Sequence, residues 1–501
     1  MRAGRWWILA AMALPAFLLN IDFYGISVAL PAIGADLGAG TTGLQWAVNG
    51  FNLALIAPLI AFGRLGDLVG RRRLLLVGVV LFAAGSALCG FATDMGMLIL
   101  GRCVQGLAVA LFSTSPLAIV GDVFPAERHA LAFSIWAAIG AAGSAVGPLV
   151  GGALTDLFGW RWFFFVNLPV AALTILLVLA IVPESKDETP QGAFDRLGFI
   201  AITLGLAALV YGLQSGDDAG WTAPVVLGPL ALGAACLLLA VRTERRAVAP
   251  LLEPGLFRVP GYLAVLGVAV AGNFGFSAVI FFSALYLQNQ QGLAPLQAGL
   301  AMLAFSVCFV VTLPLAGALM RRAGPRALMA LGMALMAAAS LLYLPGGLVW
   351  LVVGLGVAGI GQGFAFNTST TAAMDAVPTA RSGAAAGVLN AARQLGSILG
   401  IAVAGAAFQS LESRGLLAAM HDHADLDAQR VALIRALYAG SDAARAALDG
   451  LAPGLHAEIA TTMAAVFATS FQGAMLACAA VSLAGVAVAL RVPKGPPPAA
   501  G

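Results

Sequence analysis

The stretch LNIDFYGISVALP, residues Leu19–Pro31, lies inside the first long apolar run of the chain. It places the carboxylate of Asp22 near the middle of a segment long enough to cross a bilayer as a helix. A carboxylate is costly in hydrocarbon, so an acid at that depth is by default a functional residue. The other acids fall in loops or at the ends of apolar runs. The sequence therefore predicts a membrane protein with one deeply buried, titratable site.

The rest of the chain has the composition of a membrane protein. Of its 501 residues, 61% are hydrophobic and only 10% are charged, which is typical of a polytopic membrane protein. No basic tract of the kind that binds nucleic acid is present. Residues 1–32 begin like a signal peptide, but the run is too long and contains Asp22, so we expect a retained first helix.

Apolar runs of about 20 residues, the length that a bilayer requires, recur along the chain. They lie near 7–32, 43–63, 74–92, 97–121, 130–154, 162–183, 197–215, 222–241, 260–287, 296–319, 327–344, 347–372, 382–408 and 462–490. The runs predict fourteen transmembrane helices. With the N-terminus inside, nineteen of the 26 Lys and Arg fall on the cytoplasmic side, which agrees with the positive-inside rule. We therefore expect both termini in the cytoplasm.

The two halves of the chain repeat each other. After the second run the chain reads GRLGDLVGRRR, Gly63–Arg73, and after the tenth it reads GALMRRAGPR, Gly317–Arg326. After the fourth run it reads DVFPAER, Asp122–Arg128, and after the twelfth DAVPTAR, Asp375–Arg381. Two six-helix halves in the same orientation explain these matches, and such parallel repeats are a transporter design with a site between the halves.

The repeat divides the chain into parts, which are expected as follows. They are an N-terminal six-helix bundle (1–183), two inserted transmembrane helices with cytoplasmic linkers (184–258), a C-terminal six-helix bundle (259–491) with an external loop (409–461), and a cytoplasmic tail (492–501).

Asp22 and Arg102 lack counterparts in the other half, so we expect them to be functional rather than scaffold. A carboxyl removed from water is harder to ionise, whereas a nearby arginine favours its charged form. With a rise of about 1.5 Å per residue, Asp22 lies roughly 13 Å and Arg102 roughly 8 Å below the outer helix ends, so the two can meet and couple protons. Alternatively, Asp22 is a structural acid bonded to Asn20 or Ser27, and Arg102 bonds carbonyls or snorkels outward.

Two glycine-rich patterns are candidates for moving parts. The first is the gating loop with Gly63, Asp67, Gly70, Arg71 and Arg72. Its glycines permit tight turns and its acid can lie at a helix N-terminus, so we expect a latch between the halves near the start of the thirteenth run. Alternatively, the positive charge of the loop only sets the orientation of the protein in the membrane. That would explain the arginines but not the glycines or Asp67.

The second pattern lies in the fifth run and contains Gly143, Gly147, Pro148, Gly151 and Gly152. Glycines at this spacing let a neighbouring helix pack closely, and the proline should kink the helix. Close packing by itself is a sufficient explanation, because the second half keeps several of the glycines without the proline.

These patterns resemble the major facilitator superfamily, and in particular its branch of fourteen-helix drug:proton antiporters. Gly63–Arg72 is similar to the family's loop motif between helices 2 and 3. Arg102 with Gln105-Gly106 is similar to its helix 4 pattern R-x-x-Q-G. Gly143–Gly152 resembles the helix 5 motif of the antiporting members, and Asp22–Pro31 the helix 1 motif of the branch.

Two further stretches, Trp160–Trp162 and Asn167–Pro169, are also similar to that branch. The chain departs from it at Tyr24 and Ser27, where the branch usually carries threonine and asparagine, and at Leu68, where a basic residue is usual. The tenth run has no acid, whereas some relatives that export divalent organic cations carry one there. That difference favours monovalent or neutral substrates.

Polar and aromatic side chains on the apolar runs can line a substrate cavity. Our candidates are Tyr24, Gln105 and Asn273. Alternatively, each of them forms a hydrogen bond between helices or contacts lipid. The segment HDH, His421–His423, provides too few ligands for a metal site, and no histidine lies in an apolar run. We expect no metal and no catalytic residues.

The resemblance implies a proton-coupled antiporter that exports amphiphilic drugs or antibiotics by alternating access. We expect a monomer in the bacterial inner membrane that binds a small amphiphile and protons, is surrounded by lipid, and binds no nucleic acid. It would use the proton-motive force and no cofactor, since the chain contains no phosphate-binding loop. The alternatives are an exporter dedicated to one endogenous metabolite or self-made antibiotic, and a non-transporting receptor or membrane enzyme. A channel is disfavoured, because no charged ring or carbonyl filter is recognisable.

Overall fold

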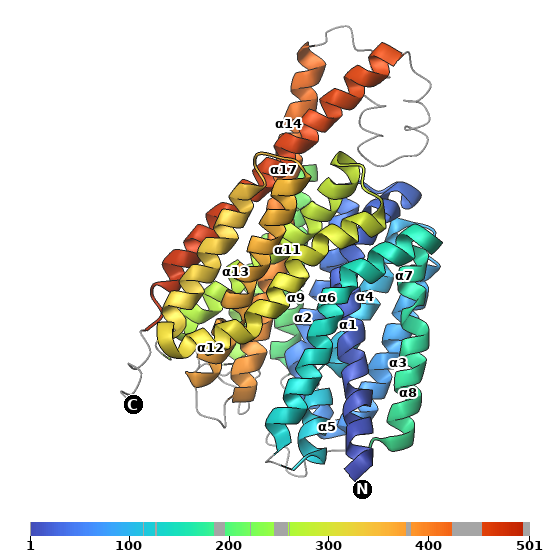
Figure 1. Cartoon of the computed structure of the whole chain (residues 1–501), viewed down its shortest axis with the longest axis vertical. Helices are drawn as coiled ribbons and strands as arrows, with labels where there is room; N and C mark the ends of the chain where they lie inside the picture. Colours follow the sequence, from blue (N-terminus) through green and yellow to red (C-terminus); the bar gives the residue numbers. More distant parts are fainter. Residues whose placement is uncertain are drawn as a thin grey trace.

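The apolar runs of the sequence form long helices that cross the molecule side by side (Figure 1). The structure, a computed structural model, describes residues 2–113, 115–125, 128–184, 196–220, 222–244, 259, 261–376, 382–422 and 453–493. Every regular element in these ranges is a helix. The predicted all-α membrane fold is confirmed.

The N-terminal half contains the first six runs. Its helices are α1 (Arg2–Leu37), α2 (Thr41–Val69), α3 (Arg71–Gly90), α4 (Met95–Phe112), α5 (Ser115–Val123), α6 (His129–Phe158), α7 (Arg161–Phe165) and α8 (Asn167–Ile181). Two of the predicted runs are interrupted. The fourth is divided into α4 and α5, and the sixth into α7 and α8, with Val166 as the only residue between them.

The C-terminal half contains the last six runs. Its helices are α11 (Tyr262–Leu285), the π-helix η3 (Tyr286–Gln290), α12 (Pro295–Leu342), α13 (Leu348–Asp375), α14 (Ser382–Asp422) and α17 (Pro453–Ala489). Both α14 and α17 are longer than their predicted runs and extend beyond the neighbouring helices (Figure 1). The two ends of the segment 409–461, predicted as a loop, are therefore helical.

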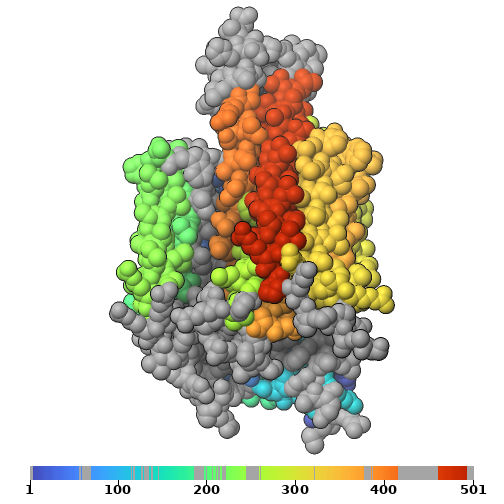
Figure 2. Space-filling model, turned by 90° about the vertical axis from the view of Figure 1, so that its left-hand side faces the viewer, coloured from blue at the N-terminus to red at the C-terminus, as the bar shows by residue number. Residues whose placement is uncertain are grey.

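The inserted pair α9 (Arg196–Ala219) and α10 (Pro224–Glu244) stands at one side of the molecule, at the left in Figure 2. Helix α9 packs against α2 and α14, so it contacts both halves. The Trp46 and Tyr211 rings, 6.0 Å apart, form part of its contact with α2. Helix α10 packs on α9 and is mostly exposed. Its apolar surface fits the predicted contact with lipid.

Among the described residues, 11 helices are long and apolar enough to cross a membrane. The three remaining predicted runs, 43–63, 130–154 and 197–215, fall within α2, α6 and α9. The total of fourteen transmembrane helices stays a prediction.

Two glycines at equivalent positions of the repeat turn the chain between successive helices. Gly70 has a φ of 117° and separates α2 from α3, and Gly324 has a φ of 76° and interrupts α12 between the tenth and eleventh runs. Both values lie in the region that residues with a Cβ rarely adopt. The repeated glycine thus makes the same tight connection in both halves.

The halves join along their interface through a hydrophobic core that includes residues of α1, α11, α12 and α14. We call the end at which α1 begins the inner end, following the predicted orientation, and the opposite end the outer end. Two hydrogen bonds join the halves near the outer end: Gln288 donates to the Val28 carbonyl at 2.8 Å, and Gln409 to Thr42 Oγ1 at 2.7 Å.

Helices α6 and α12 also meet near the outer end. A Cβ added to Gly152 of α6 would lie 2.5 Å from the carbonyl oxygen of Pro295, at the start of α12. Only a glycine permits this contact without movement of one backbone. The outer ends of the two halves are therefore closed against each other.

Candidate functional site

Asp22 of α1 and Arg102 of α4 form a buried ion pair. Arg102 Nη1 donates to Asp22 Oδ2 at 2.5 Å, and the side chains are 1% and 0% exposed, respectively. The structure therefore brings together the two residues for which the sequence predicted similar depth. An arginine at this distance stabilises the charged carboxylate, whereas burial away from water opposes its charge.

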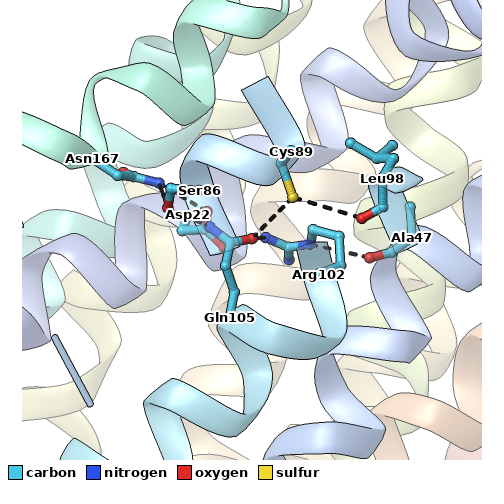
Figure 3. A network of polar contacts seen from close by, with 8 residues as sticks. All are labelled: Asp22, Ala47, Ser86, Cys89, Leu98, Arg102, Gln105 and Asn167. Carbon is cyan, nitrogen blue, oxygen red and sulfur yellow. Dashed lines mark hydrogen bonds and ion pairs between the residues drawn. The ribbon is translucent and has the colours of Figure 1, made fainter. Parts of the chain in front are cut away.

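Three polar side chains complete the environment of the carboxylate (Figure 3). Gln105 Nε2 and Asn167 Nδ2 lie 3.4 and 3.3 Å from Asp22 Oδ1, and both also donate to Ser86 Oγ, at 2.8 and 3.2 Å. Gln105 Oε1 accepts from Arg102 Nη1 at 2.8 Å. The resulting network, Asp22–Arg102–Gln105–Ser86–Asn167, connects α1, α3, α4 and the start of α8.

Arg102 has two further contacts, both with α2. Its Nε donates to the Ala47 carbonyl at 3.1 Å, and its guanidinium lies 4.3 Å from the centre of the Phe51 ring. A cation over an aromatic face is favoured when both are removed from water. Arg102 therefore does donate to a backbone carbonyl, as the alternative interpretation predicted, but it does so in addition to its ion pair with Asp22.

The alternative partners of Asp22 are not the ones observed. Asn20 donates to the Ala16 carbonyl at 2.7 Å and accepts from Ser144 at 2.8 Å. The hydrogen bonds of Asp22 go to other helices instead. A carboxylate held by two other helices, α4 and α8, responds to their positions relative to α1, as a residue bonded within its own helix would not.

Sequence reasoning missed Ser86 and did not assign Asn167 to the site. Ser86 is one of several serines on apolar helices, and nothing in the sequence marks it. Asn167 lies in the N-x-P stretch that resembled the antiporter branch, so a signal was present. The break at Val166 starts α8 at this asparagine and directs it towards Asp22.

The glycine pattern of α6 packs against α1 on both sides of Asp22. A Cβ on Gly25 would lie 2.6 Å from the Gly147 carbonyl oxygen and 2.7 Å from the Phe163 ring. Gly143 similarly approaches Phe17, three residues before Asn20. Small residues allow this close approach. The helix that carries the carboxylate is therefore in rigid contact with the helix that meets α12.

Two further residues of the glycine pattern in α6 also lie in close helix contacts. Gly151 approaches the backbone of Gly25, and Pro148 lies against Gly299 of α12. Helix α6 runs through Pro148 without interruption. One side of α6 thus contacts α1, and the other contacts the opposite half.

The gating loop meets the end of α5 at the inner end. Arg71 Nη1 donates to Asp122 Oδ2 at 2.8 Å, so two patterns found in the sequence form an ion pair within the N-terminal half. The backbone N–H of Arg72 donates to Glu184 Oε1 at 3.1 Å, and its guanidinium to the Leu179 carbonyl at 2.9 Å. These contacts join the start of α3 to the end of α8.

Some of the predicted residues of these loops lie outside the part of the chain that the structure describes, and others are exposed. The side chain of Asp67 and the surroundings of Gly63 lie outside the described residues, as does Arg381, so the proposed latch stays a prediction. Arg128 and Asp375 are exposed.

Of the three cavity candidates, only Gln105 belongs to the Asp22 network. Tyr24 is half-buried and follows Phe23 on α1, where its ring lies 5.4 Å from that of Phe276 in the other half. Asn273 donates to the Ala269 carbonyl of its own helix at 3.0 Å, and no described hydrogen bond connects it to the network. Its assignment to the cavity stays a prediction.

A series of aromatic rings crosses the interface between the halves, and we call it the aromatic row. Successive neighbours in it are Phe51, Phe23, Phe276, Phe305, Phe309 and Phe366, with ring centres 6.4, 6.4, 5.3, 6.0 and 5.8 Å apart. The row starts on α2, beneath Arg102, and ends on α13. Four of its rings are buried in the core, and only Phe23 and Phe366 are partly exposed.

Within the described ranges, no three His, Cys, Asp or Glu side chains converge as a metal site. The side chains of His421 and Asp422, and all of His423, lie outside the described residues.

A family model described as Major Facilitator Superfamily matches residues 12–401. "Multidrug resistance protein Stp" of Mycobacterium tuberculosis is 34% identical to this chain and covers 90% of it, over 84% of its own length. "Probable actinorhodin transporter" of Streptomyces coelicolor is 36% identical, over 84% of this chain and 75% of its own.

The fold is similar to a solved structure, a bacterial homolog to the human lysosomal transporter Spinster in an inward-facing and occupied conformation. The TM-score is 0.65 at 16% identity, and the match covers 98% of this chain and 99% of that one. These similarities account for the helix order and for the two halves.

Proposed function

This chain belongs to the major facilitator superfamily, and on that basis we propose that it is a proton-driven exporter of amphiphilic drugs or antibiotics. The observation that carries this proposal is the buried Asp22–Arg102 ion pair. A buried charge pair is a weak device for stability, because the desolvation of both ions offsets their attraction. A carboxylate that gains and loses a proton during transport explains why the pair is present.

In the proposed cycle, Asp22 takes a proton from the outside and releases it to the inside. Protonation removes the negative charge and leaves Arg102 with the neutral oxygens of Gln105 and Ala47. The donors on Gln105 and Asn167 then keep Ser86 Oγ and a neutral carboxyl oxygen, which accepts more weakly than a carboxylate. The attraction between α1 and the helices α4 and α8 weakens, so α1 can shift.

The contacts of α1 transmit such a shift to the interface between the halves. Gly25 fixes α1 against Gly147 of α6, and Gly152 of α6 meets Pro295 of α12. A movement of α1 therefore changes the contact that closes the outer end. Protonation at Asp22 and opening of the outer end are in this way coupled through packed backbones, as alternating access requires.

The proton gradient supplies the energy, so we propose that the protein needs no cofactor and catalyses no reaction. One proton contributes about 1.4 kcal/mol per pH unit, and the membrane potential about 2.3 kcal/mol per charge per 100 mV. We also propose that it acts as a monomer in the inner membrane, since each chain contains both halves and the whole of the Asp22–Arg102 pair.

The relatives support two ranges of substrate. One is named a multidrug resistance protein and another a probable actinorhodin transporter. The first name favours export of many drugs, and the second favours an exporter dedicated to one self-made antibiotic. The partly exposed rings of the aromatic row, Phe23 and Phe366, suit flat aromatic molecules in either case.

The test is uptake by proteoliposomes that contain the full chain, with a panel of fluorescent amphiphiles and an imposed pH gradient. We expect several members to accumulate against their own gradient, to compete with one another, and to stop accumulating when a protonophore is added. Accumulation of a single member identifies the dedicated exporter. Accumulation that is unaffected by the protonophore would overturn proton coupling.

A further inference from the structure

Arg393 of α14 is a second arginine buried within a membrane-spanning helix. It is 6% exposed, and its guanidinium lies 3.7 Å from the centre of the Phe366 ring. Its Nη2 donates to the Phe366 carbonyl at 2.8 Å, to Thr370 Oγ1 at 2.6 Å and to Ser369 Oγ at 3.2 Å. Its Nε is buried and has no hydrogen-bond partner.

Every partner of Arg393 is neutral. Among the described residues no carboxylate lies within ion-pair distance of it, whereas Arg102 is neutralised by Asp22. An arginine within a bilayer is expensive to keep unpaired and by default marks a functional site. The two buried arginines therefore differ: one holds the proposed proton site, and the other has an unsatisfied charge and an unsatisfied donor.

The position of Arg393 connects it to the interface. Phe366, over which it lies, is the last ring of the aromatic row, and Phe51 at the first ring lies against Arg102. Arg393 is also close enough to Tyr24 of the opposite half for the two side chains to interact electrostatically. A guanidinium thus borders each end of a row of rings that crosses between the halves.

We propose that Arg393 binds the anionic group of an acidic aromatic substrate, with the rings of that substrate against Phe366 and Phe23, the partly exposed rings of the aromatic row. Arg393 Nε has no partner, and a charge-assisted hydrogen bond from a guanidinium to a carboxylate is among the strongest in proteins. Flat rings match the phenylalanines beside it. This proposal rests on the proposed export function and narrows its substrate class from monovalent or neutral amphiphiles to monoanions.

Export of an anion changes the charge that one transport cycle moves across the membrane. If an anion leaves while a proton enters, both movements carry positive charge inwards. One exchange then moves two charges across the membrane, whereas exchange of a proton for a monovalent cation moves none. Export of the proper substrate should therefore respond to membrane potential as well as to the pH gradient.

The first experiment measures binding to the full chain in lipid nanodiscs, without any gradient, so that it does not depend on proton coupling. The probes are anthracene carboxylic acid, the matching carboxamide and aminomethyl anthracene. We expect the wild type to bind the acid most tightly. Arg393→Gln should weaken binding of the acid by about 10- to 100-fold and leave binding of the carboxamide unchanged.

Arg322→Gln is the matched control, because it removes an exposed arginine from the same half, distant from the row. Equal weakening of all three probes by Arg393→Gln, or equal weakening of the acid by the control, would overturn the assignment. If Arg393→Gln does not fold, the wild type still decides: tighter binding of the amine or the carboxamide than of the acid refutes the proposal.

The second experiment measures uptake of the acid by wild-type proteoliposomes with a potential imposed by potassium and valinomycin at equal pH on both sides. Uptake that follows the potential supports anion export. Gradient-driven uptake of neutral or cationic amphiphiles, without binding of the acid, would leave the proposed export function intact and remove only the anion site.

Discussion

Replacement of Asp22 by asparagine keeps the size of the side chain but removes its charge and its proton. Arg102 then loses its only carboxylate among the described residues and retains Gln105 Oε1, the Ala47 carbonyl and the Phe51 ring. Removal of one partner of a buried pair costs about 3–5 kcal/mol. Because these other contacts remain and asparagine can still accept a hydrogen bond, we expect a cost near the lower end, about 3 kcal/mol.

The effect on transport should be larger than the effect on stability. With a gradient of one pH unit and a potential of 100 mV, one coupled proton contributes about 3.7 kcal/mol. This corresponds to accumulation of a neutral substrate by about 500-fold at equilibrium. Without a titratable group at position 22, Asp22→Asn should only equilibrate substrate, so accumulation should fall to about onefold while downhill exchange continues.

The assay is uptake by proteoliposomes at matched protein content, with circular dichroism and gel filtration to establish that the variant is folded. Asp22→Glu is the matched control, since it keeps the carboxyl but lengthens the side chain, and it should retain gradient-dependent accumulation at a lower rate. If Asp22→Asn still concentrates substrate with the same dependence on the pH gradient, then Asp22 does not couple protons, and the role given to the ion pair is wrong.

Three further substitutions test a close helix contact, a glycine turn and an exposed ion pair. Gly25→Ala should destabilise the protein by about 1–3 kcal/mol, because its Cβ would lie 2.6 Å from the Gly147 carbonyl oxygen; thermal unfolding in detergent measures this, and an unchanged midpoint contradicts the close contact. Gly70→Ala should cost about 1–2 kcal/mol from its φ of 117°, while alanine at the open, helical Gly317 provides the control in the same assay. Asp36→Asn should change stability by less than about 1 kcal/mol, since its pair with Arg161 is 46% and 39% exposed; a larger loss would show that this outer pair is structural.

Several features of the site were accessible from the sequence. Asp22 and Arg102 were identified because a charge within a long apolar run is conspicuous, and their depths followed from the rise of a helix. The equivalence of Gly70 and Gly324 followed from the repeat, and the structure gives both a positive φ.

Other features were not accessible. Ser86 is not conspicuous, and the ring contact between Phe23 and Phe276 joins residues from opposite halves of the chain. Nothing in the sequence distinguishes Arg393, for which the described residues include no carboxylate partner, from Arg102, which has one. The partner of a buried charge is chosen by the lateral arrangement of helices, which hydropathy does not record.

The sequence by itself thus determined the membrane fold, the two repeated halves and the depth at which charges lie, because these depend on the length and polarity of consecutive residues. The tertiary structure alone decided which helices meet and which face of each is turned inwards. In a bilayer the surface facing lipid is as apolar as the surface facing a neighbouring helix. Composition therefore cannot tell the two apart, and only packing places Asn167 beside Asp22 and Phe366 beneath Arg393.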